Sequence, residues 1–412
     1  MNPPFVIPRD LAGPHTGPLA AYVEPYATLI QGQGYRSATL RLHLQLIASF
    51  NRWLVRTHRN LHDVDESVLR RFLRSRFGNR PPANGAPHVL RRLIGLIGAA
   101  TSAVFAERPL LPSPADHLIS NYRRYLLDEL GLASSTVVGY EWHIRKFLLR
   151  QYGAGQINLR RLQIQDAIRF IREVGGRSGP RHTQLLVAAL RSFLRFLYHR
   201  GEINNDLAPA IPNVPHWTLA GLPKHISAEA IQRVLSRCER RTPLGRRNYA
   251  MLLLLARLGL RGGEVLRLNL DDIDWDASRI TIRATKGPGW AQLPLPADAA
   301  KAIADYLRRG RPSCDSRRVF LRARAPHAAV FTSSAILFAV RTALKRAGVT
   351  APRMGAHLFR HSLATSMLKQ GASLEEIGQL LRHRSPNTTA VYAKVDLNAL
   401  RPLALSWPGG VR

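Results

Sequence analysis

The residues best suited to chemistry lie late in the chain, in the segment HLFRHSLATSMLKQ at 357–370. Its apolar side chains recur at helical spacing, which places His357, Arg360 and His361 in the first turn of an expected helix. The start of a helix also carries backbone N–H groups without intrahelical partners, and these attract anions. Two imidazoles, a guanidinium and free amides at one helix start predict a phosphate site.

Two more candidates follow the next expected helix. His383 and Tyr392 are separated by the turn SPNTT and a short helical run, so histidines, an arginine and a tyrosine could converge on one place. A second interpretation stays open for two of these residues. Tyr392 would then be a core aromatic beside Val391 and Val395, and His361 would be a buried residue that packs its helix.

The charge of the chain indicates a polyanionic partner. Sixty Lys and Arg residues against 27 Asp and Glu residues leave a formal net charge of +33 over 412 residues, far more than solubility requires. Only seven of the sixty cations are lysines, and arginine binds phosphate oxygens through a planar, two-pronged set of donors. Nucleic acid is therefore the expected partner.

Cysteine usage and hydropathy favour the cytoplasm. Cys238 and Cys314 lie in unrelated contexts without CxxC spacing, so neither a disulfide framework nor a cysteine zinc site is expected. The longest apolar run, AMLLLLA at 250–256, is too short to span a bilayer, and the N-terminal MNPPFVIPRD lacks the apolar core of a signal peptide. We expect a soluble cytoplasmic protein that has no membrane partner.

The N-terminal half contains a weak internal repeat. A shift of 97 residues superposes four pairs of identical residues: Ser37 and Ser134, Thr39 and Thr136, Ile47 and Ile144, and Phe50 and Phe147. Both segments have apolar residues at helical spacing and basic residues on other faces. Two similar helical units with basic surfaces are predicted, although amphipathic helices without a common origin can also look alike.

The second half has a mixed pattern. Four prolines between 209 and 223 stop helices and keep the chain extended, so a linker is predicted at 205–224. RITIRA at 279–284 and AQLPLP at 291–296 are strand candidates, and the intervening TKGPGW suits the turn of a β-hairpin. Helical patterns follow, one of which begins with Ser373 and Glu376 at capping-box spacing.

In this order the residues resemble the tyrosine recombinase, or phage integrase, family. That family's signature has Arg in a G-L-R-x-x-E element, Lys in a hairpin turn, H-x-x-R-H at a helix start, His or Trp after an L-G-H-like element, and Tyr nine residues later. The matching elements in this chain are GLRGGE with Arg261 and Glu264, TKG with Lys286, HLFRH with His357, Arg360 and His361, LLRH with His383, and VY with Tyr392.

The resemblance also gives names to the expected domains. The fold class is mainly α with a small β-sheet (α+β), with helical DNA-binding units followed by a recombinase-like catalytic domain. The predicted divisions are an N-terminal helical unit at 1–110 that repeats the core-binding domain, a helical, SAM-like core-binding domain at 111–204, the linker at 205–224, the catalytic domain at 225–396 and a C-terminal tail at 397–412.

The resemblance implies a metal-independent transesterification. Tyr392 would attack a DNA phosphate and hold it as a 3′-phosphotyrosyl ester, leaving a free 5′ hydroxyl. The implied roles of the other residues are a phosphate clamp for Arg261 and Arg360, further donors from His357 or His383, and protonation of the departing 5′ oxygen for Lys286. Glu264 and His361 are supporting residues, and Glu264 is expected to orient neighbouring groups. No metal or nucleotide cofactor is implied, and the zinc helix HExxH is not matched, because Leu358 stands in place of its Glu.

The implied protein is a site-specific DNA recombinase or integrase that acts on double-stranded DNA as a homotetramer. The extra N-terminal unit favours an enzyme of a mobile element, with a role in transposition or integration. Two alternatives are a catalytically silent DNA-binding regulator of recombination and a type IB topoisomerase. The tail is expected to dock either on its own domain or on a neighbouring protomer.

Three departures from the family pattern stand out. Gly262 and Gly263 follow Arg261, and since glycine inside a helix costs roughly 1 kcal/mol relative to alanine, looser positioning of Arg261 is expected. Arg382 stands where the family has the glycine of L-G-H. The segment GPGWAQ after Lys286 lacks the basic residues that the family commonly places there, so weaker hairpin contacts with DNA are expected.

Overall fold

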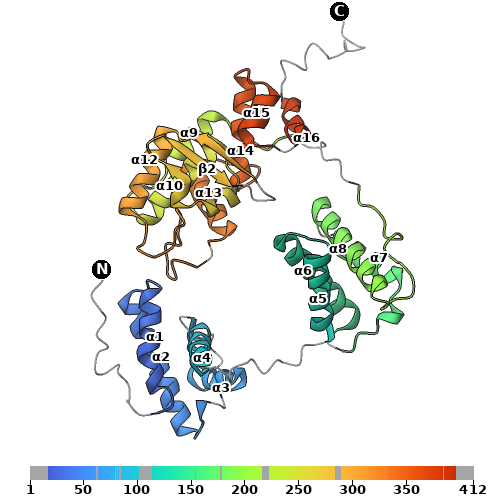
Figure 1. Ribbon diagram of the computed structural model, residues 1–412, viewed down its shortest axis with the longest axis vertical. Helices are drawn as coiled ribbons and strands as arrows, with labels where there is room; N and C mark the ends of the chain where they lie inside the picture. The colour runs from blue at the N-terminus through green and yellow to red at the C-terminus, as the bar shows by residue number, and fades with distance from the viewer. Residues whose placement is uncertain are drawn as a thin grey trace, which may run out of the picture. The chain divides into compact units, whose positions relative to one another are not determined.

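The computed structural model of the chain describes residues 17–61, 64–78, 80, 82, 85–101, 114–153, 155–176, 179–215, 222–283, 289–329, 331–383 and 385–395. Within them the fold is mainly helical with one three-stranded antiparallel sheet (Figure 1), so the predicted α+β class is confirmed. None of the described helices has the length and apolar character needed to cross a membrane. The chain divides into two compact units, Phe105–Ala220 and Met1–Val104 with Gly221–Arg412.

The first helical group contains four helices among the described residues. They are α1 (Ala20–Gly32), α2 (Ser37–Arg56), α3 (Glu66–Phe77) and α4 (Ala86–Thr101). α1 packs on α2 and α4, and α3 packs on α4. Asp65 caps α3 by accepting a hydrogen bond from the amide of Val68 at 2.8 Å, which satisfies a donor that the helix start leaves unpaired.

The second helical group has the same number of α-helices in the part that the structure describes. They are α5 (Pro114–Arg124), which continues into the π-helical turn Tyr125–Glu129, then α6 (Ser134–Tyr152), α7 (Ile164–Gly175) and α8 (Pro180–His199). α8 packs on both α6 and α7. Its proline at the first helical position is preorganised for the helix.

The two helical groups correspond element by element. α2 begins at Ser37 and α6 at Ser134, the same pair that the sequence repeat superposes. α2 packs on α4 as α6 packs on α8, and α3 packs on α4 as α7 packs on α8. Ile47 and its counterpart Ile144 are both fully buried. The duplication and the domain boundaries stay predictions, and residues 216–221 of the expected linker lie outside the described part.

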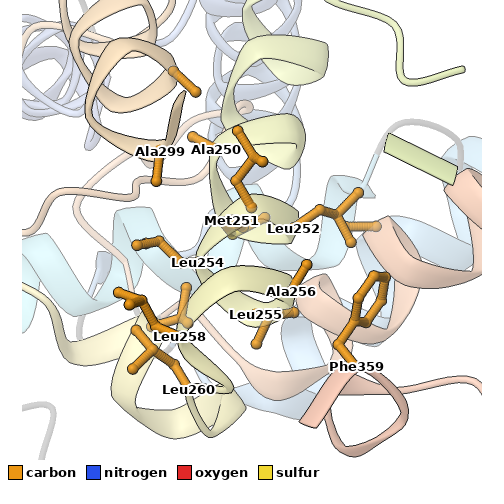
Figure 2. Packing of buried hydrophobic residues seen from close by; sticks show 14 of the residues in the cluster. Ala250, Met251, Leu252, Leu254, Leu255, Ala256, Leu258, Leu260, Ala299 and Phe359 are labelled. Atoms are coloured by element: carbon orange, nitrogen blue, oxygen red, sulfur yellow. The ribbon is translucent and has the colours of Figure 1, made fainter. Parts of the chain in front are cut away.

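The core of the C-terminal region surrounds α10 (Pro243–Leu258). α10 packs on α9 (Ala228–Ser236), α12 (Ala297–Arg309), α13 (Ser333–Ala347) and α14 (Ala356–Lys369). Every side chain of the run AMLLLLA is buried, and Figure 2 shows several of them with Ala299 of α12 and Phe359 of α14. A helix that is covered on all sides explains an apolar run without an exposed polar face.

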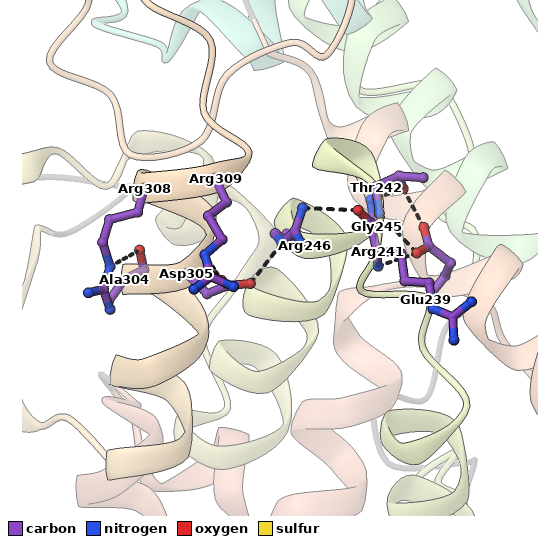
Figure 3. Close-up of polar contacts among 9 residues, drawn as sticks. All are labelled: Glu239, Arg241, Thr242, Gly245, Arg246, Ala304, Asp305, Arg308 and Arg309. Atoms are coloured by element: carbon purple, nitrogen blue, oxygen red, sulfur yellow. Dashed lines mark hydrogen bonds and ion pairs between the residues drawn. The ribbon is translucent and has the colours of Figure 1, made fainter.

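Polar contacts at the beginning of α10 fix its direction (Figure 3). Thr242 caps the helix by accepting from the amide of Gly245 at 3.0 Å, and Glu239 accepts from the amide of Thr242 at 3.0 Å. Arg246 of α10 donates to Asp305 of α12 at 2.9 Å, and Arg309 lies 3.5 Å from the same carboxylate. The pair of Arg246 with Asp305 joins α10 to α12, whereas Arg309 and Asp305 form a pair within α12.

The sheet consists of β1 (Ile273–Asp274), β2 (Arg279–Arg283) and β3 (Trp290–Pro294) in the order β1-β2-β3. β2 and β3 pair antiparallel with Arg283 opposite Trp290, so the predicted hairpin is confirmed. β1 was not predicted, because two residues carry no detectable alternation. The hairpin turn at 284–288, which includes Lys286, lies outside the described residues.

Five short elements complete the described part of the C-terminal region. They are α11 (Gly262–Arg267), a 3-10 turn at Leu270–Asp272, α15 (Leu374–Leu381), α16 (Pro386–Thr389) and a 3-10 segment at Ala390–Val395. The predicted capping box at the start of α15 is confirmed, since Ser373 and Glu376 each accept from the other's backbone amide. α15 packs on α14 and α16. The expected tail at 397–412 lies outside the described residues.

Candidate active site

The first turn of α14 supplies three of the predicted site residues. α14 begins at Ala356, one residue before His357, so the predicted helix start is confirmed. Leu358 and Phe359 are buried in the core that surrounds α10. His357 and His361 lie one turn apart, with ring centroids separated by 6.3 Å. Burial of the apolar residues between them therefore fixes where the polar side chains of this turn stand.

Arg360 on the same turn is only 4% exposed. Its Nη1 donates to the carbonyl of Gly259 at 2.6 Å, and its Nη2 donates to the carbonyl of Leu381. Burial lowers the pKa of Arg360 to about 10, and the charges of Arg261 and Arg382 act in the same direction. The guanidinium stays protonated at neutral pH and links the ends of α10 and α15.

Gly259 makes this link possible. It ends α10 in the left-handed conformation with φ of +56°, and a Cβ at this position would lie 2.7 Å from Cδ2 of the buried Leu381. Glycine adopts this conformation without steric penalty and leaves room for the leucine. The carbonyl of Gly259 can then accept the hydrogen bond from Nη1 of Arg360.

Arg261 is the N-cap of α11, and Glu264 holds it. The Nη1 of Arg261 donates to Oε1 of Glu264 at 3.0 Å, and its backbone amide donates to Oε2 at 2.8 Å. The Nη2 donates to the carbonyl of Arg382 at 3.4 Å. Gly262 and Gly263 lie in the first turn of α11. The looser positioning of Arg261 expected from them stays a prediction, and these three hydrogen bonds oppose it.

Glu264 is a buried carboxylate with 4% exposure. Burial alone would raise the pKa of Glu264. The charge of Arg382 and the hydrogen bonds from Arg261 lower it by more than burial raises it, so the pKa lies below its ordinary value. Glu264 is therefore ionised at neutral pH. It serves as an acceptor in the site and does not hold a proton to transfer.

Tyr392 lies in the 3-10 segment after α16, with 1% exposed. Its ring packs against Ala364, Ile377 and Leu381, while its hydroxyl lies 3.0 Å from Nδ1 of His361. Burial raises the pKa of Tyr392 to about 12, and the nearby Arg360 opposes this rise. Tyr392 is therefore a core aromatic whose hydroxyl nonetheless reaches a polar cluster.

His361 and His383 are neutral at neutral pH. Burial lowers the pKa of His361 to about 4, and so do the charges of His357 and Arg360. Burial also lowers the pKa of His383 to about 4, with Arg360 and Arg261 contributing. A neutral His361 can accept the Tyr392 hydroxyl hydrogen at Nδ1. His361 is half-buried, so it is not the fully buried packing residue of the alternative interpretation, and its ring lies beside the tyrosine.

His383 lies two residues after the end of α15, close enough to Arg360 and Arg261 for their charges to affect its pKa. Its backbone amide donates to the carbonyl of Gly378 at 2.9 Å, and its Nδ1 lies 2.7 Å from the hydroxyl of Thr389 at the end of α16. Sequence reasoning missed Thr389, although it lies within the SPNTT turn. The short distance to a fixed hydroxyl orients the imidazole.

Seven predicted residues thus belong to one cluster built from α11, α14, the end of α15 and the 3-10 segment. They are Arg261, Glu264, His357, Arg360, His361, His383 and Tyr392. Lys286 lies outside the described residues. Arg382, singled out in the sequence only as a departure from L-G-H, contributes both its carbonyl and its side chain to the cluster.

Comparisons with known proteins agree with this arrangement. Residues 224–398 match the phage integrase family, and residues 119–201 match the phage integrase N-terminal SAM-like domain. The protein y4rA of Sinorhizobium fredii, named as a candidate integrase/recombinase, is 42% identical over 97% of both chains. The tyrosine recombinase XerD of Listeria monocytogenes is 30% identical over 68% of this chain and 94% of its own. The chain belongs to the phage integrase family of tyrosine recombinases.

Solved structures share the fold. The XerH site-specific recombinase, bound to a palindromic difH substrate, matches with a TM-score of 0.54 at 19% identity over 71% of this chain and 97% of that one. A lambda integrase dimer bound to a core site matches with a TM-score of 0.50 at 16% identity over 72% of this chain and 98% of that one. The predicted class of enzyme, a recombinase that cuts and rejoins DNA, is confirmed.

Proposed function

We propose that this recombinase cuts DNA with Tyr392 as the nucleophile. The phenol oxygen attacks the scissile phosphorus and loses its proton, the bond to the 5′ oxygen breaks, and that oxygen takes up a proton. The products are a 3′-phosphotyrosyl ester and a free 5′ hydroxyl. A 5′ hydroxyl from a second duplex then attacks the ester, which reverses the step and joins the exchanged strand. The number of phosphodiester bonds is conserved, so the cycle needs no nucleotide cofactor.

One observation carries this proposal: the hydroxyl of Tyr392 lies in the same cluster as two fixed guanidinium groups. Each guanidinium has five N–H donors, and the contacts described above use two on Arg360 and two on the side chain of Arg261. The remaining donors suit a phosphate whose non-bridging oxygens gain charge in the transition state. His357 and His383 would add donors to the same oxygens.

Tyr392 must move before it reacts. Only 1% of its surface is exposed, and its hydroxyl is engaged with His361. A phosphate carried by duplex DNA cannot reach an oxygen that the protein covers, so the 3-10 segment has to shift when DNA binds. His361 holds the tyrosine in the DNA-free protein, and the same shift must also uncover Arg360, which is only 4% exposed.

The leaving group needs a proton donor, and we assign this role to Lys286. The assignment rests on the position of Lys286 in the turn between β2 and β3, which corresponds to the hairpin lysine of the family. Without a donor the 5′ oxygen would leave as an alkoxide, which is a far poorer leaving group than an alcohol.

Two DNA sites and four protomers complete the proposed reaction. The charge of +33 suits a protein that surrounds duplex DNA, with 111–204 as the core-binding domain, 1–110 as its repeat and 225–396 as the catalytic domain. Exchange between two sites needs one nucleophile for each of four strands, so a homotetramer is proposed. The enzyme would act at specific sites on DNA of the bacterial nucleoid as part of a mobile element.

The test is capture of the covalent intermediate. Nicked duplexes made from the genomic flanks of the gene lose a short fragment after cleavage, and this loss traps the protein on the DNA. We expect an adduct that survives denaturant and forms equally in EDTA, with none from Tyr392→Phe. Absence of an adduct with the wild-type protein on every flank, or strict dependence on magnesium, would contradict the proposal.

A further inference from the structure

Arg382 occupies a backbone conformation that its residue type disfavours. It ends α15 with φ of +55° and ψ of 51°, in the left-handed region. The helices α10 and α13 end in the same region at glycines, Gly259 and Gly348. A side chain with a Cβ pays a steric cost there, so contacts of the Arg382 side chain must offset that cost.

The side chain of Arg382 makes two such contacts. Its Nη2 donates to Oε2 of Glu264 at 2.9 Å, and its Nη1 donates to the carbonyl of Leu380 at 3.0 Å. The two charged side chains are well covered, with 14% of Arg382 and 2% of Glu264 exposed. A charge-assisted hydrogen bond between groups that are removed from water is stronger than one at the surface.

Arg382 also closes a ring of contacts with Arg261. Oε1 of Glu264 accepts from Nη1 of Arg261, Oε2 accepts from Nη2 of Arg382, and the carbonyl of Arg382 accepts from Nη2 of Arg261. The guanidinium of Arg261 is therefore held from two sides, by a carboxylate and by a carbonyl. Arg382 contributes to both contacts, because its side chain binds the carboxylate of Glu264 and its own backbone supplies the carbonyl.

The charge balance of the cluster shows why a second cation on Glu264 matters. Arg261, Arg360 and Arg382 carry three positive charges, and Glu264 carries one negative charge, which leaves a net charge of +2. Without Arg382 the net charge would be +1, and Glu264 would have Arg261 as its ion-pair partner. If Arg261 alone had to neutralise Glu264, the negative carboxylate would cancel much of the positive potential of Arg261. Arg261 would then stabilise the growing negative charge of a phosphoryl transition state less well.

We propose that Arg382 is a positioning residue that neutralises and anchors Glu264, so that Arg261 is oriented toward the phosphate with its charge available. The inference rests on the proposed function, in which Arg261 binds the scissile phosphate. Arg382 acts through Glu264 and Arg261, and it has no part in bond making or proton transfer.

Arg382→Gly isolates the role of the side chain. Glycine keeps the carbonyl that accepts from Arg261 and adopts positive φ without steric cost, so the turn should persist. Circular dichroism checks that the variant is folded, because the loss of the buried partner of Glu264 lowers stability. The measurement is the single-turnover rate of adduct formation on the nicked genomic-flank duplex, together with the dissociation constant for that duplex. We expect the rate to fall by about tenfold or more, while the dissociation constant changes by less than about twofold.

Two further variants separate positioning from a purely structural effect. Arg382→Lys keeps the positive charge beside Glu264 and should recover part of the lost rate. Glu264→Gln removes the charge that Arg382 balances, so adding Arg382→Gly to Glu264→Gln should lower the rate by less than about threefold. Equal losses in both backgrounds would overturn the inference.

Ser278→Gly is the matched control. Ser278 is exposed in the turn between β1 and β2 and also has positive φ, at 49°, so this change relieves the same backbone cost away from the cluster. It should cleave at the wild-type rate. An Arg382→Gly protein that also cleaves at the wild-type rate would show that Arg382 is only a turn residue.

Crystal structures of the DNA-free variants test the positioning role of Arg382 independently of the proposed cleavage by Tyr392. In Arg382→Gly we expect Arg261 to swing onto Glu264 and form a two-pronged ion pair, leaving the carbonyl of residue 382. An unmoved Arg261 would overturn the positioning role whatever the cleavage result. Failure of the wild-type protein to form an adduct, with Arg261 displaced in the variant, would instead count against the proposed function alone.

Discussion

At the scale of single residues, the cluster holds Tyr392, His361 and His383 in uncharged states at neutral pH, because burial raises the pKa of the tyrosine and lowers the pKa of both histidines. The hydroxyl of Tyr392 lies 3.0 Å from Nδ1 of a neutral His361, while the guanidinium of Arg360 keeps its positive charge. Arg360 is held by two backbone carbonyls. The proposed function therefore requires the Tyr392 hydroxyl to move toward a guanidinium group that is already fixed in position.

The lowered pKa of His361 predicts how stability depends on pH. Its pKa is 6.5 ordinarily and about 4 in the fold, so the unfolded chain binds the extra proton between these values and folding weakens as pH falls through this range. From pH 7 to pH 5 this group should cost roughly 1 kcal/mol, after allowance for its partial exposure.

The measurement is the thermal unfolding temperature at pH 7 and pH 5 for wild-type protein and His361→Asn. Asparagine keeps an acceptor near the position of Nδ1 but does not titrate. The variant should therefore lose less stability on acidification. An identical loss in both proteins would show that His361 does not carry the shifted pKa.

The role of Lys286 can be tested by changing the leaving group. Lys286→Ala should slow cleavage of an ordinary duplex by about 100-fold or more, because the 5′ oxygen then leaves without a proton. A duplex with sulfur in place of that bridging oxygen releases a thiolate, which needs no proton donor. The variant should cleave this substrate at nearly the wild-type rate, as measured by adduct formation in single turnovers. A defect that persists with the sulfur substrate would assign Lys286 another role.

At the scale of elements, the end of α10 determines whether Arg360 is held. Gly259 and Gly348 both end helices with positive φ, but a Cβ would meet Leu381 at the first and open space at the second. Gly348→Ala should therefore cost only the backbone penalty of about 1–2 kcal/mol. Gly259→Ala should cost about 1–3 kcal/mol more, because the methyl group overpacks a filled core.

Urea unfolding of the two variants measures this difference. Gly259→Ala should also slow adduct formation, since the carbonyl of residue 259 accepts from Arg360, whereas Gly348→Ala should not. Equal losses of stability in the two proteins would show that the space beside Leu381 is not limiting.

Sequence patterns predicted the elements that carry strong local signals. The hairpin, the helix start before His357 and the capping box at Ser373 all follow from turn chemistry and spacing within a few residues. The two-residue β1 has no such signal.

The pairing of Arg382 with Glu264 joins residues 118 positions apart, so only the folded chain brings these two side chains together. Arg382 was noticed because its residue type differs from a family pattern, and its positive φ explains why glycine is usual there.

At the scale of the whole molecule, the charge of +33 predicts strongly salt-dependent binding. A protein that contacts 6–10 phosphates loses about 10³–10⁵ in affinity between 50 and 200 mM salt, and a loss in this range is expected for a duplex of any sequence. Tyr392→Phe should give the same slope, because the substitution removes no cation. Fluorescence anisotropy with labelled duplexes measures both. A loss of less than about tenfold would show that few phosphates are neutralised.

The most direct measurement of the central claim is the chemical identity of the linkage to DNA. The adduct formed on the nicked duplex is digested with trypsin and a nuclease, and the modified peptide is sequenced by mass spectrometry. We predict a phosphodeoxynucleotide on Tyr392, attached through its 3′ phosphate. Attachment to any other residue, or through a 5′ phosphate, would contradict the account.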